Sequence, residues 1–288
     1  MTDGQKSIEE LRSEFDRLDA AIHDLLMQRA AVSGQMAGAK GATPSMRPAR
    51  EMEILRRLAA RHKGEMPLAA VVRIWREIMA ASLALQGDFK VYLPGNDDGH
   101  ALWDLARFHF GSGAPLVALG GALHVVQELG AGSGDIGVLP EPLFEEDEPW
   151  WPHLLFTSEG GPRIVAKLPF LLGAPGYDFP PAFAVSNAVQ RATGDDATLI
   201  AALTGPDFSR AKAGALFKSH GFDVRLVSLA PDGDSGRRYM LFETTAFVAE
   251  DDDRLAVLQD ASEDILQLKV VGGYARPIDA GALQGGKS

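Results

Sequence analysis

Polar side chains stand at positions that helical periodicity assigns to an apolar face. Arg29 interrupts the seam of a first helix, and Ser82 and Gln86 continue the apolar stripe of a later one. A buried, unpaired guanidinium costs several kcal/mol, so together these residues indicate a polar pocket for an anion inside a helical bundle. Each also has an ordinary alternative: Arg29 reaches water along its stem, and Ser82 and Gln86 lie near a fraying helix end. The seam itself consists of Leu11, Phe15, Leu18, Ile22, Leu25, Val32 and Met36.

The spacing of the basic residues predicts how a pocket would be assembled. Arg29 and Lys40 are eleven residues apart, so they share a helix face at roughly 16 Å. Arg12 lies a further 17 residues back, roughly 25 Å along the same helix, and cannot reach the same pocket from the same copy. Arg50 and Glu51 add polar groups at the start of the next helix. A single very long helix among three also lacks a compact core of its own, and both points favour an intertwined dimer.

Bulk composition excludes several classes of protein. The net charge of −11 argues against a nucleic-acid scaffold, and the absence of cysteine excludes disulfides and thiolate metal sites. The seven histidines show no ligand spacing, so we expect no metal site. No apolar run approaches ~20 residues, and residues 1–12 do not read as a signal peptide, so we expect a soluble cytoplasmic protein without membrane contact.

Three segments of different texture follow one another. Residues 6 to about 88 read as helical with one break at 41–48. From Phe89, short apolar runs alternate with helix-like stretches, which is typical of α/β structure. From Thr198 the pattern predicts strand 198–204, helix 207–220, strands 222–229 and 237–248, helix 251–266 and strand 267–274, the βαββαβ order of a ferredoxin-like unit. Trp150 and Trp151 look exposed, and packing between domains is the role we assign to them.

The helical segment, Ile8–Gln86, resembles the all-α chorismate mutase family. The family's motif falls on Arg12, Arg29, Lys40, Arg50, Glu51, Ser82 and Gln86. One position departs from the pattern: Arg47 stands where many members have an acidic residue that helps to bind substrate, so affinity is affected more than activity. The resemblance implies the rearrangement of chorismate to prephenate, a pericyclic reaction that needs no cofactor.

The resemblance also implies a role for each residue. Arg29 and Arg12 of the partner subunit would bind the two carboxylates of chorismate, while Lys40 and Gln86 would donate to the ether oxygen, where negative charge develops. Glu51 would accept a hydrogen bond from the ring hydroxyl, and Ser82 and Arg50 would complete the pocket. We therefore predict that Lys40, Gln86 and Arg29 are catalytic.

The remaining segments resemble the partners to which chorismate mutases are often fused. Residues 89–195 follow prephenate dehydratase in outline only, because the Thr-Arg-Phe signature is replaced by Pro181-Ala182-Phe183 and the segment is about 70 residues short of two lobes. Residues 198–277 resemble an ACT domain, in which Gly214, Ala215 and Leu216 match an effector-binding motif, although Ser228-Leu229-Ala230-Pro231 departs from the second. An aromatic amino acid is the candidate effector, and a domain that serves only dimer contacts is the alternative.

We therefore predict a multi-domain chain that forms a homodimer or higher homo-oligomer. Its parts are an all-α chorismate mutase domain (1–88) that forms an intertwined dimer, a truncated, degenerate prephenate dehydratase-like α/β domain (89–195), a ferredoxin-like α+β ACT domain (196–278) and a flexible tail (279–288). Two further functions stay open: a bifunctional mutase–dehydratase, and a non-catalytic amino acid sensor. A chorismate mutase would form prephenate only, whereas the bifunctional enzyme would go on to phenylpyruvate. A sensor would bind an aromatic amino acid without any turnover.

Overall fold

A computed structural model describes residues 6–38, 46–95, 100–129, 135–146 and 148–281 of the 288-residue chain. It begins with three helices: α1 (Ile8–Gly38), α2 (Pro48–Arg61) and α3 (Leu68–Ala84). An α/β part follows, with β1 (Val91–Pro94), α4 (Ala101–Phe110), β2 (Leu116–Leu119), α5 (Ala122–Glu128), β3 (Ile136–Pro140), the 3₁₀ helix η1 (Trp151–Phe156), β4 (Arg163–Leu168), β5 (Leu171–Leu172) and β6 (Ala182–Ser186). The last part comprises β7 (Asp196–Thr204), α6 (Arg210–Ser219), β8 (Val224–Pro231), β9 (Arg238–Thr244), α7 (Asp253–Asp260), β10 (Ile265–Ala275) and β11 (Ile278–Asp279).

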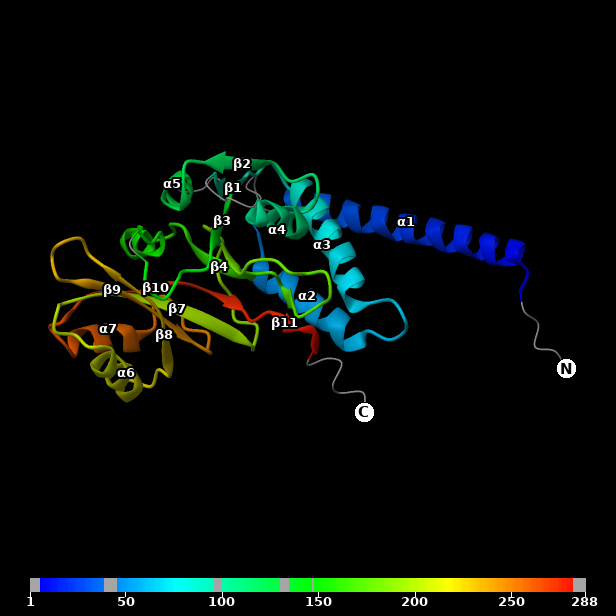
Figure 1. Ribbon diagram of the computed structural model, residues 1–288. Coiled ribbons are helices and arrows are strands. Elements are labelled where there is room, and N and C mark those ends of the chain that lie inside the picture. Colours follow the sequence, from blue (N-terminus) through cyan, green and yellow to red (C-terminus); the bar gives the residue numbers. More distant parts are fainter. Residues whose placement is uncertain (1–5, 39–45, 96–99, 130–134, 147, 282–288) are drawn as a thin grey trace.

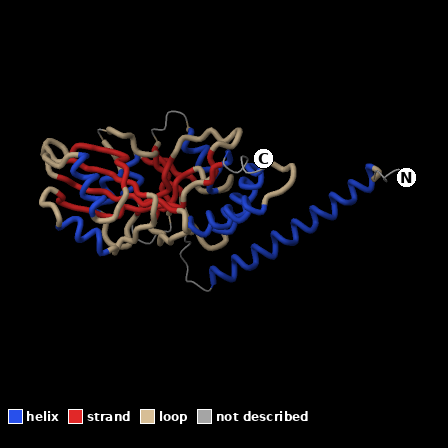
Figure 2. The backbone as a smooth tube through the Cα atoms, turned by 90° about the horizontal axis from the view of Figure 1, so that it is seen from below, coloured by secondary structure: helices blue, strands red, loops and turns tan. Residues whose placement is uncertain are grey.

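The long helix α1 projects away from the rest of the molecule (Figures 1 and 2). Its start is fixed by a capping box, since the Ser7 amide donates to the Glu10 carboxylate at 2.7 Å and the Glu10 amide donates to the Ser7 hydroxyl at 3.2 Å. The predicted break at 41–48 ends at Pro48, in the first turn of α2. Residues 62–67 separate α2 from α3; three helices require this second interruption, although the sequence pattern located only the first. None of the helices within the described ranges combines the length and hydrophobicity required to cross a bilayer.

Nine strands form one sheet in the order β2-β1-β3-β6-β4-β10-β7-β9-β8. The strands β1, β2 and β3 are parallel, as expected of an α/β segment, whereas β6 pairs antiparallel with both β3 and β4. The C-terminal part follows the predicted βαββαβ order, as β7, α6, β8, β9, α7 and β10. Its four strands form the antiparallel part of the sheet, in the order β10-β7-β9-β8. The predicted boundary at residues 195–196 therefore falls at the start of β7, inside a continuous sheet.

One hydrophobic core runs along a whole face of this sheet. It contains Tyr92 of β1, Phe183 of β6, Leu199 of β7 and Leu241 of β9, all buried. The opposite face is divided between a cluster under α2, α3 and α4 and another under α6 and α7. Side chains alternate across each strand, so neighbouring residues of β7 serve different clusters.

The two tryptophans correct one expectation and support another. Trp150 and Trp151 look exposed in the sequence, but their exposed fractions are 2% and 0%. The indole of Trp151 donates to the Ser228 hydroxyl of β8 at 3.2 Å, so it packs between segments as expected.

The predicted loose tail is also partly wrong, because Asp279 pairs with Leu172 in the small parallel sheet of β5 and β11.

The two halves of the sheet meet where β10 passes β4 at Gly272. This glycine has φ of +139°, and a Cβ atom there would lie 2.2 Å from the Ile164 carbonyl oxygen. We expect Gly272→Ala to lower the free energy of unfolding by more than about 1 kcal/mol, measured by chemical denaturation. Gly214→Ala is the matched control: a Cβ atom there meets nothing within 4 Å, and inside α6 alanine should stabilise by about 0.5–1 kcal/mol. Equal effects of the two changes would contradict a close approach at the sheet junction.

Candidate active site

Arg29 joins the first and third helices of the candidate site. Its guanidinium donates to the Ser82 hydroxyl and to the Ile78 carbonyl oxygen, the latter at 3.3 Å. The side chain is half-buried, and burial lowers the pKa of the Arg29 guanidinium below its ordinary value. Within the described part of the chain no carboxylate pairs with it. A half-buried cation without an acidic partner is the arrangement that an anionic ligand requires.

Ser82 and Gln86 lie one turn apart on the same face of the third helix. Ser82 is 9% exposed, and its hydroxyl also donates to the Ile78 carbonyl oxygen at 2.7 Å. Gln86 is half-buried, and its Nε2 donates to the Ser82 carbonyl oxygen at 3.1 Å. The structure thus brings Arg29 against Ser82 and places Gln86 one turn further along the same helix.

The other predicted basic residues lie elsewhere or outside the description. Arg12 is exposed near the start of α1, as expected of a residue that would serve a second copy. Arg50 is exposed and donates to the Glu53 carboxylate of the next turn at 2.9 Å. Lys40 lies outside the described residues.

Glu51 takes part in a buried charge network that was not predicted. Its carboxylate pairs with Arg76 of α3, whose exposed fraction is 2%. Arg76 also donates from Nε and Nη2 to the His109 carbonyl oxygen, at 2.9 and 2.6 Å, and its guanidinium lies 5.2 Å from the centre of the Phe170 ring. Glu51 is therefore tied through one arginine to the end of α4 and to the α/β part of the chain.

His109 is the third member of this network. Its side chain is 1% exposed, and neither ring nitrogen has a hydrogen-bond partner in the part of the chain that the structure describes. Burial, with the nearby charge of Arg76 as a smaller cause, holds the pKa of His109 well below its ordinary value. The ring is therefore neutral at pH 7, and it contacts Phe110 and Phe170 edge-on.

The predicted effector motif has an unexpected setting. Gly214, Ala215 and Leu216 lie inside α6, and no atom lies close enough to Gly214 to require a glycine there. Packing within the described residues therefore does not explain the glycine at position 214. Effector binding at these three residues stays a prediction.

Comparison with known proteins identifies the class of the helical segment. Residues 11–87 match the model of the family described as Chorismate mutase type II. This segment contains Arg12, Arg29, Glu51, Ser82 and Gln86. The N-terminal part of the chain therefore carries a chorismate mutase type II domain.

Particular relatives extend the likeness beyond that segment. The chain is 31% identical over 143 residues to a bifunctional chorismate mutase/prephenate dehydratase of Pseudomonas aeruginosa, covering 47% of this chain and 39% of the relative. A protein of the same name from Neisseria gonorrhoeae is 34% identical over 107 residues, covering 37% of this chain and 29% of the relative. The chain thus spans well under half the length of these relatives.

Solved structures give a weaker likeness. Prephenate dehydratase from Streptococcus mutans has a TM-score of 0.43 at 14% identity, covering 66% of this chain and all of that chain. Prephenate dehydratase in complex with L-Phe from Arthrobacter aurescens has a TM-score of 0.45 at 13% identity, covering 65% of this chain and 90% of that chain.

Proposed function

We propose that this protein is a chorismate mutase that converts chorismate to prephenate. The observation that carries the proposal is the contact between Arg29 and Ser82 within the segment that matches the family model. It places between two helices a half-buried guanidinium that has no carboxylate partner among the residues described. Chorismate is a dianion, so such a cation would both bind it and orient it.

Catalysis would come from conformation and charge. Arg29 and Arg12 of the partner subunit bind the two carboxylates and hold the folded diaxial conformer. Lys40 and Gln86 donate to the ether oxygen as its bond to carbon breaks, and Glu51 accepts from the ring hydroxyl. Glu51 is held by Arg76, which fixes the carboxylate in place before substrate binds. No proton transfer, covalent intermediate or cofactor is needed.

A second copy of the chain completes this site in the proposal. The seam of α1 has no cover along most of its length: Phe15, Ile22 and Leu25 are 66%, 56% and 64% exposed. An apolar stripe of this length on a projecting helix is characteristic of a surface that pairs with another protein. Antiparallel pairing of two α1 helices would cover the stripe and carry each Arg12 to the other copy's Arg29.

A complementation assay tests activity and assembly together. Arg12→Ala and Arg29→Ala should each abolish most prephenate formation when assayed alone. When the two variants are unfolded, mixed in equal amounts and refolded, half of the dimers are mixed and one of their two sites is intact. We therefore expect about a quarter of the wild-type rate. Sedimentation measures the oligomeric state of each sample.

The outcomes separate the parts of the proposal. An active wild-type chain whose variants do not complement would contradict the shared site but not the activity. A wild-type chain that consumes no chorismate would contradict the activity.

A bifunctional mutase–dehydratase is the second candidate, because the curated relatives carry that name. The residues that replace the dehydratase signature argue against it: Pro181 and Ala182 stand where the signature has Thr and Arg, and neither side chain can donate a proton or bind a carboxylate. We infer that residues 89–195 are a degenerate dehydratase-like unit and residues 196–278 an ACT-like one. Formation of phenylpyruvate from prephenate would establish the second activity instead. Binding of phenylalanine without any turnover would favour the sensor.

A further inference from the structure

The largest cavity described in this chain lies outside the mutase site. It has a volume of 880 Å³, within the range of small-molecule sites. It is lined where three parallel strands end, at Pro94 of β1, at Gly120 and Gly121 after β2, and at Pro140 of β3. The chain leaves β1 for β2 on one side and returns to β3 on the other, and ligands of α/β sheets bind at such a switch point.

Two other segments close the cavity. Phe156, at the end of η1, and Tyr239 of β9 line it, with their ring centres 6.3 Å apart in an edge-on contact. Trp150 adds a third aromatic side chain. Phe156 is 55% exposed, so an apolar surface remains open to a ligand. The cavity therefore offers the flat, aromatic walls that bind planar molecules and cations.

The carboxylates are the permanently charged side chains among the described lining residues. Glu146 and Glu148 line the cavity, and none of its described lining residues is a lysine or an arginine. The imidazoles of His124 and His153 also line it, and burial lowers the pKa of the His153 ring, so that ring adds no positive charge at pH 7. A dianion such as chorismate or prephenate would be repelled here.

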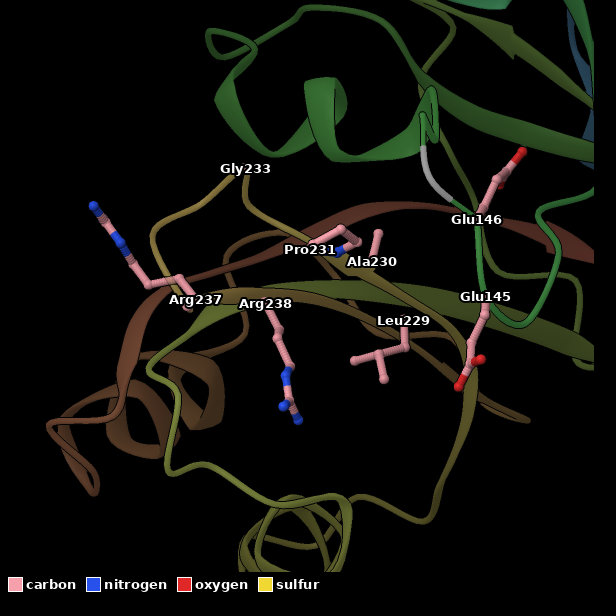
Figure 3. Close-up of a pocket in the computed structure, with 9 residues that line it drawn as sticks. Glu145, Glu146, Leu229, Ala230, Pro231, Gly233, Arg237 and Arg238 are labelled. Atoms are coloured by element: carbon pink, nitrogen blue, oxygen red, sulfur yellow. The ribbon is translucent and has the colours of Figure 1, made fainter.

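Glu146 is the acid best placed to hold a ligand. Its Oε2 is buried and has no hydrogen-bond partner among the described residues, and burial raises the pKa of this carboxyl group. Figure 3 shows a neighbouring pocket that Glu145 and Glu146 also line; the two side chains leave the backbone in opposite directions, and Glu146 points away from Arg237 and Arg238. Glu145 is paired instead with Arg210 at 3.1 Å. Glu146 thus has an unused acceptor, and a cationic ligand would satisfy it.

We propose that this cavity binds a small organic cation, a protonated amine carried on a planar aromatic body. The amine pairs with Glu146, and the ring lies against Phe156 and Tyr239. The site is separate from the mutase site, selects the opposite charge, and goes beyond the function proposed above.

Three probes with the same ring system test the charge preference by calorimetry on the full chain. Tryptamine is cationic, 3-methylindole is neutral and indole-3-propionate is anionic. We expect tryptamine to bind at least about tenfold more tightly than either of the others. Glu146→Gln should reduce tryptamine to the affinity of 3-methylindole, whereas the neighbouring Glu145→Gln should leave it unchanged.

Further controls locate the binding and identify the contrary results. Tryptamine should bind Arg29→Ala as tightly as wild type, because the mutase site is not involved. Circular dichroism confirms that each variant is folded. The proposal is overturned if none of the probes binds, if indole-3-propionate binds as well as tryptamine, or if Glu146→Gln has no effect.

Discussion

Arg29→Ala is expected to lower kcat/KM for chorismate by about 100- to 1,000-fold, which corresponds to about 2.7–4 kcal/mol of transition-state stabilisation. The guanidinium is half-buried, donates to Ser82 and has no carboxylate partner in the described ranges, so a bound carboxylate of the substrate would be its counter-ion. Steady-state measurement of chorismate consumption gives kcat and KM separately. A lower kcat together with a higher KM is expected when a group that both binds and orients the substrate is removed.

Two further variants make this result specific. Arg29→Lys keeps the charge but loses the forked pair of donors, so we expect intermediate activity. Arg57→Ala removes an exposed arginine of α2 and should leave kcat/KM unchanged. Near-normal activity of Arg29→Ala in a folded protein would show that the half-buried guanidinium has only a structural role.

Much of this site could be predicted from sequence because helical periodicity is strict. A seam residue must face a neighbouring helix, so Arg29 and Ser82 were expected to meet, and they do. The α/β character of the middle part followed from short apolar runs that alternate with helix-like stretches. The place of β6 in the sheet could not be predicted, because β6 lies late in the segment yet inserts between β3 and β4, and no local pattern encodes those neighbours.

Arg76 was missed for a different reason. Sequence reasoning singled out only Ser82 and Gln86 on the third helix, so a buried Arg76 was not predicted. In the structure Val72, Arg76, Met79 and Leu83 form a buried stripe, and Ser82 is buried beside it. The spacing of four, three and four was present in the sequence, but only the partners, the Glu51 carboxylate and the His109 carbonyl group, explain why an arginine is stable there. Such partners come from other elements and cannot be read from one helix.

Arg76→Leu is therefore expected to lower the free energy of unfolding by about 3 kcal/mol. The change leaves the Glu51 carboxylate without its cation and the His109 carbonyl group without two donors. Because Arg76 is only 2% exposed, water cannot readily replace these contacts. Chemical denaturation at pH 7 measures the loss. The matched control is Arg210→Leu, whose partner Glu145 is exposed, and it should cost less than about 1 kcal/mol.

A double variant separates the charge from the packing. Adding Glu51→Leu to Arg76→Leu removes the uncompensated carboxylate, so the double variant should be more stable than Arg76→Leu alone. Because Arg76 links α2, α3 and the end of α4, its loss should also release Glu51 and lower mutase activity in the protein that remains folded. If the double variant is no more stable than the single one, the Glu51 carboxylate is not held by Arg76. The coupling between the helical segment and the α/β part would then rest on apolar packing between α3 and α4.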